Sequence, residues 1–224
     1  MSNDEQNEEV KEQSGPAMLQ LGEKVPNFEA ETTHGPLELY DRNPDSWVIL
    51  FSHPADFTPV CTTEFMAFAE RNEEFEQRNV KLLGNSVDSV HSHIAWVCNI
   101  KENFGVDIPF PIIADLDQKV ARKFGMIHAA SSDTAAIRAV YFIDPDRRLQ
   151  AMIYYPLETG RNFDEILRVV DALQTSEERG VATPADWQPG DKVIVPPPST
   201  AQEADERVND ESLEVTDWYF SKKE

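Results

Sequence analysis

Short apolar runs alternate along the middle of the chain with longer stretches in which every third or fourth residue is apolar. A run of strand length predicts a β-strand, and the wider spacing predicts an amphipathic helix. On this basis we expect strands at 48–52, 80–87, 110–114, 138–143 and 149–155, and helices at 62–78, 89–104, 120–124 and 163–174. The turn sequence Asp144-Pro145-Asp146 separates the last two strands, so we expect them to form a hairpin.

The helix expected at 163–174 has the clearest pattern. Asn162 stands at its N-cap position with Glu165 three residues later, which is a capping signature. Its apolar stripe consists of Phe163, Ile166, Leu167, Val170 and Leu173. Such a face must cover a sheet. Strands that alternate with helices and end in a hairpin and a helix predict an α/β fold, a thioredoxin-like sandwich of three layers around a mixed sheet.

The two ends of the chain differ in composition from its middle. Residues 1–17 are acidic and almost free of large apolar groups, so we expect a disordered acidic tail. Residues 18–178 contain the predicted strands and helices and should form the main domain. Prolines punctuate 179–224, which we expect to be a small C-terminal extension. Three adjacent aromatic residues near its end, Trp218 to Phe220, need a surface to lie against.

Composition restricts the class of protein. A chain of 224 residues with 40% hydrophobic residues can hold one core and a smaller appendage. Its 41 acidic and 20 basic residues give a net charge of −21, which argues against nucleic acid or an anionic membrane as a partner. The acidity fits either a surface adapted to high salt or an ordinary acidic protein. Two cysteines and a start without a basic or apolar segment predict a cytoplasmic protein.

Cys61 lies where an apolar strand gives way to a helix. Unpaired backbone N–H groups and the positive end of the helix dipole favour a thiolate at such a position. Pro54 and Pro59 stiffen the turn, and Thr58 places a hydroxyl three residues before the sulfur. We therefore expect a reactive thiol that is presented to solvent rather than a buried one.

The other candidate side chains have simpler explanations. Cys98 shares one side of its predicted helix with apolar residues, namely Val90, Ile94, Val97 and Phe104. We therefore expect a buried, unreactive thiol at Cys98, with a redox role as the alternative. His91 and His93 point to different sides of the same helix, so they do not predict a metal site.

The segment formed by Pro54, Thr58 and Cys61, Pro-x-x-x-Thr-x-x-Cys, resembles the active-site loop of the peroxiredoxins. Three further segments resemble the long one-cysteine type of that family: IRAVYFID, YYPLETGRNFDEILRVVDALQ and VATPADWQPGDKVIVPPP. The resemblance implies a thiol-dependent peroxidase that reduces hydrogen peroxide and organic hydroperoxides through a sulfenic acid on Cys61. No cofactor and no metal are expected. It also implies that 18–178 is the peroxidase domain and that 179–224 serves dimerisation.

The resemblance also implies roles for the cations of the site. Arg138 corresponds to the active-site arginine, which holds the thiolate and polarises the peroxide O–O bond. Arg161 corresponds to a second, supporting cation, with a surface arginine as the alternative. His53 either forms a hydrogen bond with the sulfur or ends the strand. Of the remaining motif residues, Thr58 should help to stabilise the transferring charge, or act only as a turn residue, and Pro54 should shield the intermediate.

The reducing step and the assembly state follow from the same comparison. The C-terminal extension contains no cysteine, so the oxidised Cys61 must react with an external thiol reductant, or with Cys98 after a rearrangement. A homodimer is implied, and a decamer is conceivable in this family. The rival interpretation is a peroxide sensor or a chaperone-like thiol protein without rapid turnover. A disulfide oxidoreductase would require C-x-x-C, whereas Glu64 occupies the second position here.

Overall fold

The computed structural model describes residues 18–41 and 44–224, so the acidic tail expected at 1–17 lies outside the described residues. A five-stranded mixed sheet forms the centre of the fold, in the order β5-β4-β3-β6-β7. Its strands are β3 Trp47–Ser52, β4 Val80–Ser86, β5 Ile112–Ala114, β6 Arg138–Ile143 and β7 Leu149–Tyr155. β3, β4 and β5 are parallel, whereas β6 is antiparallel to both β3 and β7. The five predicted strands and the hairpin are thereby confirmed.

Five helices accompany this sheet. They are α1 Pro59–Glu70, α2 Asn72–Gln77, α3 Val90–Phe104, α4 Lys119–Lys123 and α5 Phe163–Arg179. The helix expected at 62–78 begins earlier because proline is favoured in the first turn, and it is interrupted at Arg71. The Asn162 side chain accepts a hydrogen bond from the Glu165 N–H, as the capping signature predicted. α5 continues beyond the predicted end to Gly180, whose φ of 59° ends the helix.

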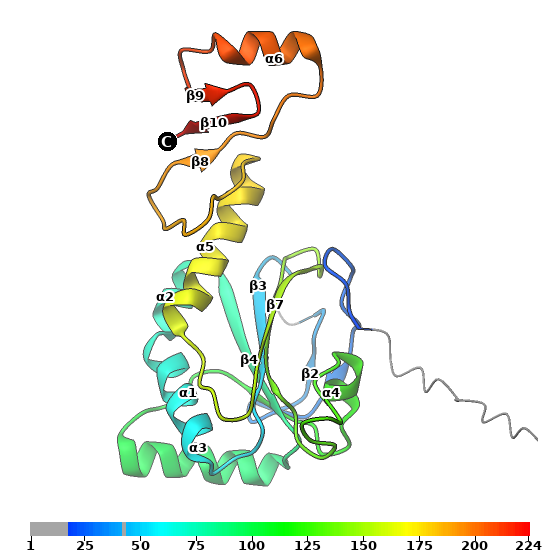
Figure 1. The fold of residues 1–224 in the computed structure, drawn as a ribbon. Helices are drawn as coiled ribbons and strands as arrows, with labels where there is room; N and C mark the ends of the chain where they lie inside the picture. The colour runs from blue at the N-terminus through cyan, green and yellow to red at the C-terminus, as the bar shows by residue number, and fades with distance from the viewer. Residues whose placement is uncertain (1–17, 42–43) are drawn as a thin grey trace, which may run out of the picture.

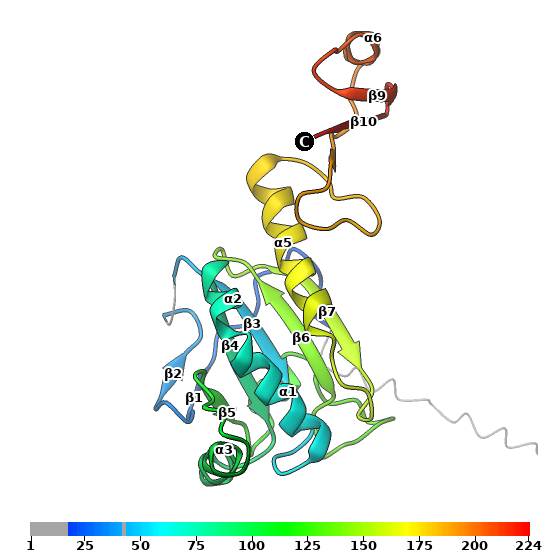
Figure 2. The same ribbon diagram turned by 90° about the vertical axis from the view of Figure 1, so that its left-hand side faces the viewer.

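Helices and a small hairpin cover the two faces of the sheet (Figures 1 and 2). Apolar side chains of α1, α2, α3 and α5 pack in one core cluster with β3, β4 and β6. α4 and the hairpin of β1 Glu29–Ala30 and β2 Leu37–Glu38 pack in a second cluster on the other face. The predicted sandwich of three layers around a mixed sheet is therefore confirmed.

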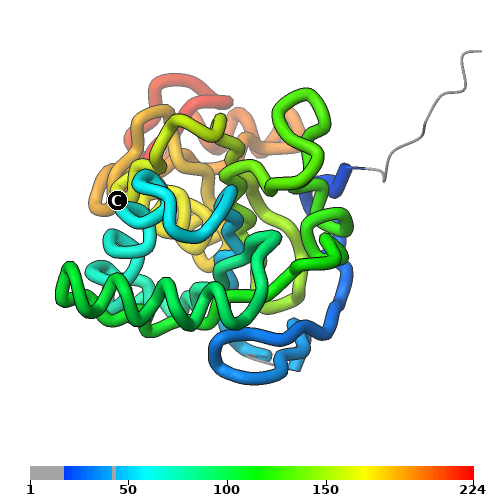
Figure 3. Tube along the Cα trace, turned by 90° about the horizontal axis from the view of Figure 1, so that it is seen from below, coloured from blue at the N-terminus to red at the C-terminus, as the bar shows by residue number. Residues whose placement is uncertain are grey.

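α3 presents a different face to the core from the one that the sequence predicted. Its buried residues are His93, Trp96 and Ile100, whereas Ile94 is 46% exposed and Cys98 is exposed as well. The helix is rotated so that its largest side chain, Trp96, enters the core, and this rotation turns Cys98 outward. The prediction of a buried Cys98 is therefore wrong. Figure 3 views the molecule from below, and α3 runs across the end that faces the viewer.

The C-terminal segment folds into a small unit beyond the end of α5 (Figure 1). It consists of β8 Val193–Ile194, α6 Ala201–Val208, β9 Glu214–Asp217 and β10 Phe220–Lys223, with the sheet order β8-β10-β9. A cluster of Val181, Trp187 and Val193 is its buried apolar core. Its aromatic residues Trp218, Tyr219 and Phe220 are 44%, 55% and 37% exposed. Among the described residues, no helix has the length and apolar character needed to cross a membrane.

Candidate active site

Cys61 lies in the first turn of α1. Thr58 is the N-cap residue, and the first described intrahelical bond runs from the Thr62 N–H to the Thr58 carbonyl. The backbone N–H groups of Val60 and Cys61 precede that bond, so their positive ends point toward the start of the helix. The predicted position of Cys61 at a helix N-terminus is correct.

The Cys61 thiol is nevertheless fully buried, with 0% of its surface exposed, which corrects the expectation of a presented sulfur. Cys61, Phe65 and Phe68 recur at helical spacing and share the face of α1 that packs on the sheet. The position that favours a thiolate therefore also turns the side chain inward. Burial and reactivity are compatible here because a cation accompanies the sulfur into the interior.

A surface hollow lies beside the thiol. Its lining consists of Pro54, Thr58, Pro59, Val60, Arg138, Leu157 and Glu158. The hollow is thus formed by the loop before α1, the first turn of α1, the start of β6 and the loop after β7. Because the Cys61 sulfur has no accessible surface, a reactant reaches it only when this lining gives way slightly. The geometry favours a small reactant.

Arg138 opens β6 and makes direct contact with the sulfur. Its Nη1 lies 3.2 Å from Cys61 Sγ and donates to Glu64 Oε2 at 2.7 Å. Its Nε donates to the Leu157 carbonyl at 2.8 Å. The residue is only 3% exposed. The guanidinium is therefore fixed from two sides, and the predicted proximity of Arg138 to Cys61 is present in the structure.

Glu64 is a residue of the site that the sequence reasoning missed. It lies one helical turn after Cys61, is 2% exposed, and joins the two arginines. The backbone N–H and Nε of Arg161 donate to Oε1, each at 2.9 Å, and Arg161 Nη2 donates to Oε2 at 2.6 Å. Every partner is a donor, so Glu64 is an ionised carboxylate. The available signal was a charged residue within the apolar stripe of a helix.

Arg161 is buried, so the alternative of a surface arginine is wrong. In addition to its bonds to Glu64, its Nη1 donates to the carbonyls of Ser52 and Ala139 at 3.1 and 3.2 Å. The guanidinium also lies over the Phe51 ring, 5.2 Å from its centroid. Arg161 thus orients Glu64, which in turn orients Arg138.

An ionised Cys61 would balance the charges of these groups. Two guanidinium groups and one carboxylate leave one net positive charge in the interior. An uncompensated buried charge is costly, and a thiolate on Cys61 cancels it. The network around Glu64 therefore favours the nucleophilic form of the thiol.

The three other predicted site residues lie in the loop that leads into α1. Thr58 donates its hydroxyl to the Ala55 carbonyl at 2.9 Å and does not cap the helix with its side chain. Pro54 lines the hollow beside the sulfur. His53 is fully buried, and its Nε2 lies 2.9 Å from Asp56 Oδ1. Within the described part of the chain, the side-chain partner of His53 is Asp56 and not the sulfur.

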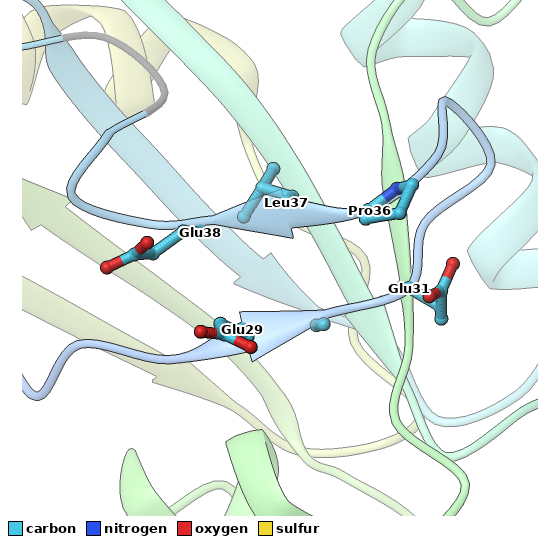
Figure 4. A pocket seen from close by; sticks show the side chains of 6 residues that line it. Glu29, Glu31, Pro36, Leu37 and Glu38 are labelled. Atoms are coloured by element: carbon cyan, nitrogen blue, oxygen red, sulfur yellow. The ribbon is translucent and has the colours of Figure 1, made fainter.

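A second hollow lies away from the thiol, at the hairpin of β1 and β2. Its lining includes Glu29, Glu31 and Glu38. In Figure 4, the carboxylates of Glu29 and Glu38 lie near one end of the hairpin and that of Glu31 near the other. Because these groups do not converge on one point, we assign no site to this hollow.

Glu64→Gln should destabilise the fold, because the two buried guanidinium groups lose their counter-charge. Breaking a buried ion pair in this way costs about 3–5 kcal/mol of unfolding free energy. Denaturant unfolding of this variant and of Glu70→Gln, an exposed position on the same helix, measures the difference. Equal stability of the two variants would contradict the structural role of Glu64.

Comparison with known proteins assigns most of the chain to a family. The AhpC/TSA family model matches residues 21–152, and the model for the C-terminal domain of 1-Cys peroxiredoxin matches residues 172–211. A peroxiredoxin of Aquifex aeolicus is 58% identical over 217 residues, which cover 92% of this chain and 97% of that protein. A peroxiredoxin of Thermoplasma volcanium is 52% identical and covers 89% of this chain and 96% of its own length.

Solved structures agree with these sequence matches. A yeast mitochondrial 1-Cys peroxiredoxin superposes with a TM-score of 0.83 at 43% identity and covers 92% of this chain and 99% of its own. A cysteine-to-serine mutant of peroxiredoxin 6 of Arenicola marina gives a TM-score of 0.80 at 43% identity, with 92% and 98% covered. The buried Cys61, in the first turn of α1 and in contact with Arg138, thus belongs to a chain with two matched segments, 21–152 and 172–211. Both segments point to the same family. The chain belongs to the peroxiredoxins, in the AhpC/TSA family, and is a thiol-dependent peroxidase of the one-cysteine type.

Proposed function

We propose that Cys61 is the nucleophile that reduces hydrogen peroxide and organic hydroperoxides. The observation that carries the proposal is the 3.2 Å contact between Arg138 Nη1 and the buried Cys61 sulfur. The thiolate attacks the terminal peroxide oxygen, a sulfur–oxygen bond forms and the O–O bond breaks. Cys61 becomes a sulfenic acid, and the other oxygen takes up a proton and leaves as water or alcohol.

The residues around the sulfur have distinct roles in this step. Arg138 stabilises the negative charge that moves from sulfur to the leaving oxygen, because its Nη1 already lies at the sulfur. Thr58 keeps lone pairs on its hydroxyl oxygen that can accept a hydrogen bond from the bound peroxide. Pro54 lines the hollow and limits the access of water to the intermediate. Arg161 acts through Glu64, and His53 supports the loop that carries Pro54 and Thr58.

An external thiol completes the cycle by reducing the sulfenic acid. Cys61 and Cys98 are both free thiols; Cys61 is buried in α1 and Cys98 lies on the outer face of α3. The yeast mitochondrial relative is described as resolved via glutathione/thioredoxin systems, which supports a small thiol or a thioredoxin-like donor here. Excess peroxide would oxidise Cys61 further. Rapid turnover with such a donor separates the peroxidase from a sensor or chaperone.

Cys61→Ser should abolish peroxide reduction and leave the fold intact, since a serine hydroxyl is not ionised near neutral pH. Peroxide consumption with a thiol donor measures this. Cys98→Ser is the matched control and should retain the wild-type rate of Cys61 oxidation. Turnover above the uncatalysed rate in Cys61→Ser would rule out Cys61 as the nucleophile.

Arg138→Ala should slow peroxide attack by about a hundredfold or more, because it removes a group that stabilises both the thiolate and the developing charge. Arg138→Lys should restore little, since a single ammonium cannot reach Leu157, Glu64 and the sulfur together. Stopped-flow oxidation and the pH dependence of Cys61 alkylation test this expectation. An alkylation profile of Arg138→Ala identical to that of the wild type would show that another group activates the thiol.

We further propose a homodimer, and a decamer is the larger assembly that such dimers would build. The exposed aromatic residues Trp218, Tyr219 and Phe220 form one apolar patch on the C-terminal unit, which a second chain can cover. The net charge of −21 argues against nucleic acid and anionic membranes as partners of this protein. A cytoplasmic location remains a prediction, supported by two cysteines that are not joined in a disulfide.

Truncation after Pro198 should dissociate the dimer, because it removes α6, β9, β10 and the aromatic patch. Mass measurement in solution at low and high salt tests this, since salt screens repulsion between acidic surfaces. The matched variant replaces Trp218 and Tyr219 with serine and leaves the chain at full length. An unchanged assembly state in both proteins at every salt concentration would show that the patch is not a subunit contact.

A further inference from the structure

Three buried polar side chains in and beside the active-site loop take no part in the chemical step described above. His53 directly follows β3, Asp56 lies with it in the loop 53–58, and His93 lies on α3. The side chains are between 0% and 1% exposed. Asp56 and His93 are 37 residues apart in sequence, so the cluster joins the active-site loop to α3.

His93 lies between two hydrogen-bond acceptors. Its Nδ1 is 2.9 Å from Asp56 Oδ2 and 3.1 Å from Oδ1, and its Nε2 is 3.0 Å from the Ile113 carbonyl. A carbonyl carries no proton. Burial alone would raise the pKa of Asp56, but hydrogen bonds from His53 and His93 outweigh that effect and lower it, so Asp56 is a carboxylate. With Asp56 ionised, both nitrogens of His93 face acceptors, which is the arrangement that an imidazolium satisfies.

The protonation state of His53 follows from the same inventory. Its Nε2 donates to Asp56 Oδ1 at 2.9 Å, whereas its buried Nδ1 has no hydrogen-bond partner. Burial lowers the pKa of His53, so its ring is neutral near pH 7 and its Nδ1 is unprotonated. Asp56 therefore faces one charged and one neutral histidine. Asp88 adds a further carboxylate, which accepts the Asp56 backbone N–H at 3.1 Å.

The loop has a conformation that requires such an anchor. Phe57, the residue after Asp56, has a φ of 55° and is 56% exposed. A residue other than glycine persists in this left-handed region only where its surroundings fix it. Asp56 is fixed by His53, His93 and also Ser92, whose hydroxyl donates to Oδ2 at 2.7 Å. The strain at Phe57 and the anchoring of Asp56 are separate observations that point to the same function.

We propose that Asp56 and an imidazolium at His93 form a buried ion pair that positions loop 53–58 beside Cys61 and fixes His53 as the neutral, Nε2-protonated tautomer. Asp56 and His93 are positioning residues and do not contact the sulfur themselves. The kinetic consequence rests on the proposed role of Cys61. The protonation states of His53 and His93 do not depend on that role. A failure of this proposal can therefore be distinguished from a failure of the proposed role of Cys61.

Nuclear magnetic resonance of the full-length protein labelled with ¹⁵N at its five histidines tests the protonation states. Long-range ¹H–¹⁵N correlations distinguish an imidazolium from each neutral tautomer, and single-site variants assign the signals. At pH 7 we expect two protonated nitrogens in His93 and Nε2–H in His53. In Asp56→Asn, the amide can donate to His93 Nδ1, so His93 should become neutral. A neutral His93 or a charged His53 in the wild type would overturn the proposal.

Stopped-flow oxidation of Cys61 by hydrogen peroxide tests the positioning role. Asp56→Asn and His93→Gln should each slow oxidation by about tenfold or more per folded molecule, since a displacement of about 1 Å at a reacting group costs up to about a hundredfold. His91→Gln, an exposed position on the same helix, should keep the wild-type rate. Because Asp56→Asn is nearly isosteric, it provides the test of the positioning role if His93→Gln does not fold. A wild-type rate in Asp56→Asn would overturn the positioning role.

Metal analysis supplies a third outcome. The ligand atoms of His53, Asp56 and His93 lie within 4.8 Å of one another, and a metal bound there would replace the Nδ1 proton of His93. The wild type and Asp56→Asn are incubated with Zn²⁺ and dialysed against a chelator. We expect no retained zinc in either protein. One zinc per chain in the wild type and none in the variant would overturn the ion pair and identify a metal site instead.

Discussion

The active site depends on a buried carboxylate held between two guanidinium groups. Glu64 comes from α1, Arg138 from β6 and Arg161 from the segment before α5, so one set of hydrogen bonds fixes three elements that are distant in sequence. The same set leaves one positive charge, which an ionised Cys61 would cancel. The interaction that holds the elements together therefore also favours a thiolate on Cys61, the nucleophile that we propose. Stability and reactivity cannot be altered independently at this point of the fold.

The sheet was predictable because its central strands are buried on both faces. Every residue of β3 and β6 is buried, and a continuous apolar run carries that information directly. α3 was harder, because apolar residues occur around most of its circumference and no single stripe dominates. Only packing against the sheet decides that Trp96 faces inward and Cys98 outward. The C-terminal sheet consists of strands too short to give a periodic signal.

The site was predictable in its motif and not in its supporting contacts. Cys61, Thr58 and Pro54 lie within one short segment, so their proximity follows from the chain itself. Glu64 and Arg161 are 97 residues apart, and His93 and Asp56 are 37 apart. When α3 was considered alone, His93 was only one of two histidines on different sides of a helix. Its relation to Asp56 exists only after the sheet and α3 have packed.

The burial of Cys61 makes the two halves of the catalytic cycle unequal in their steric demands. A hydroperoxide presents two bonded oxygen atoms of small radius, and it can reach the sulfur through the hollow beside Pro54 with little displacement of the lining. A thiol or a disulfide needs an in-line approach of a bulkier sulfur with its substituents. If Cys61 is the nucleophile that we propose, the segments around this hollow admit a peroxide more readily than an oxidised thiol, which would disfavour a mixed disulfide on Cys61.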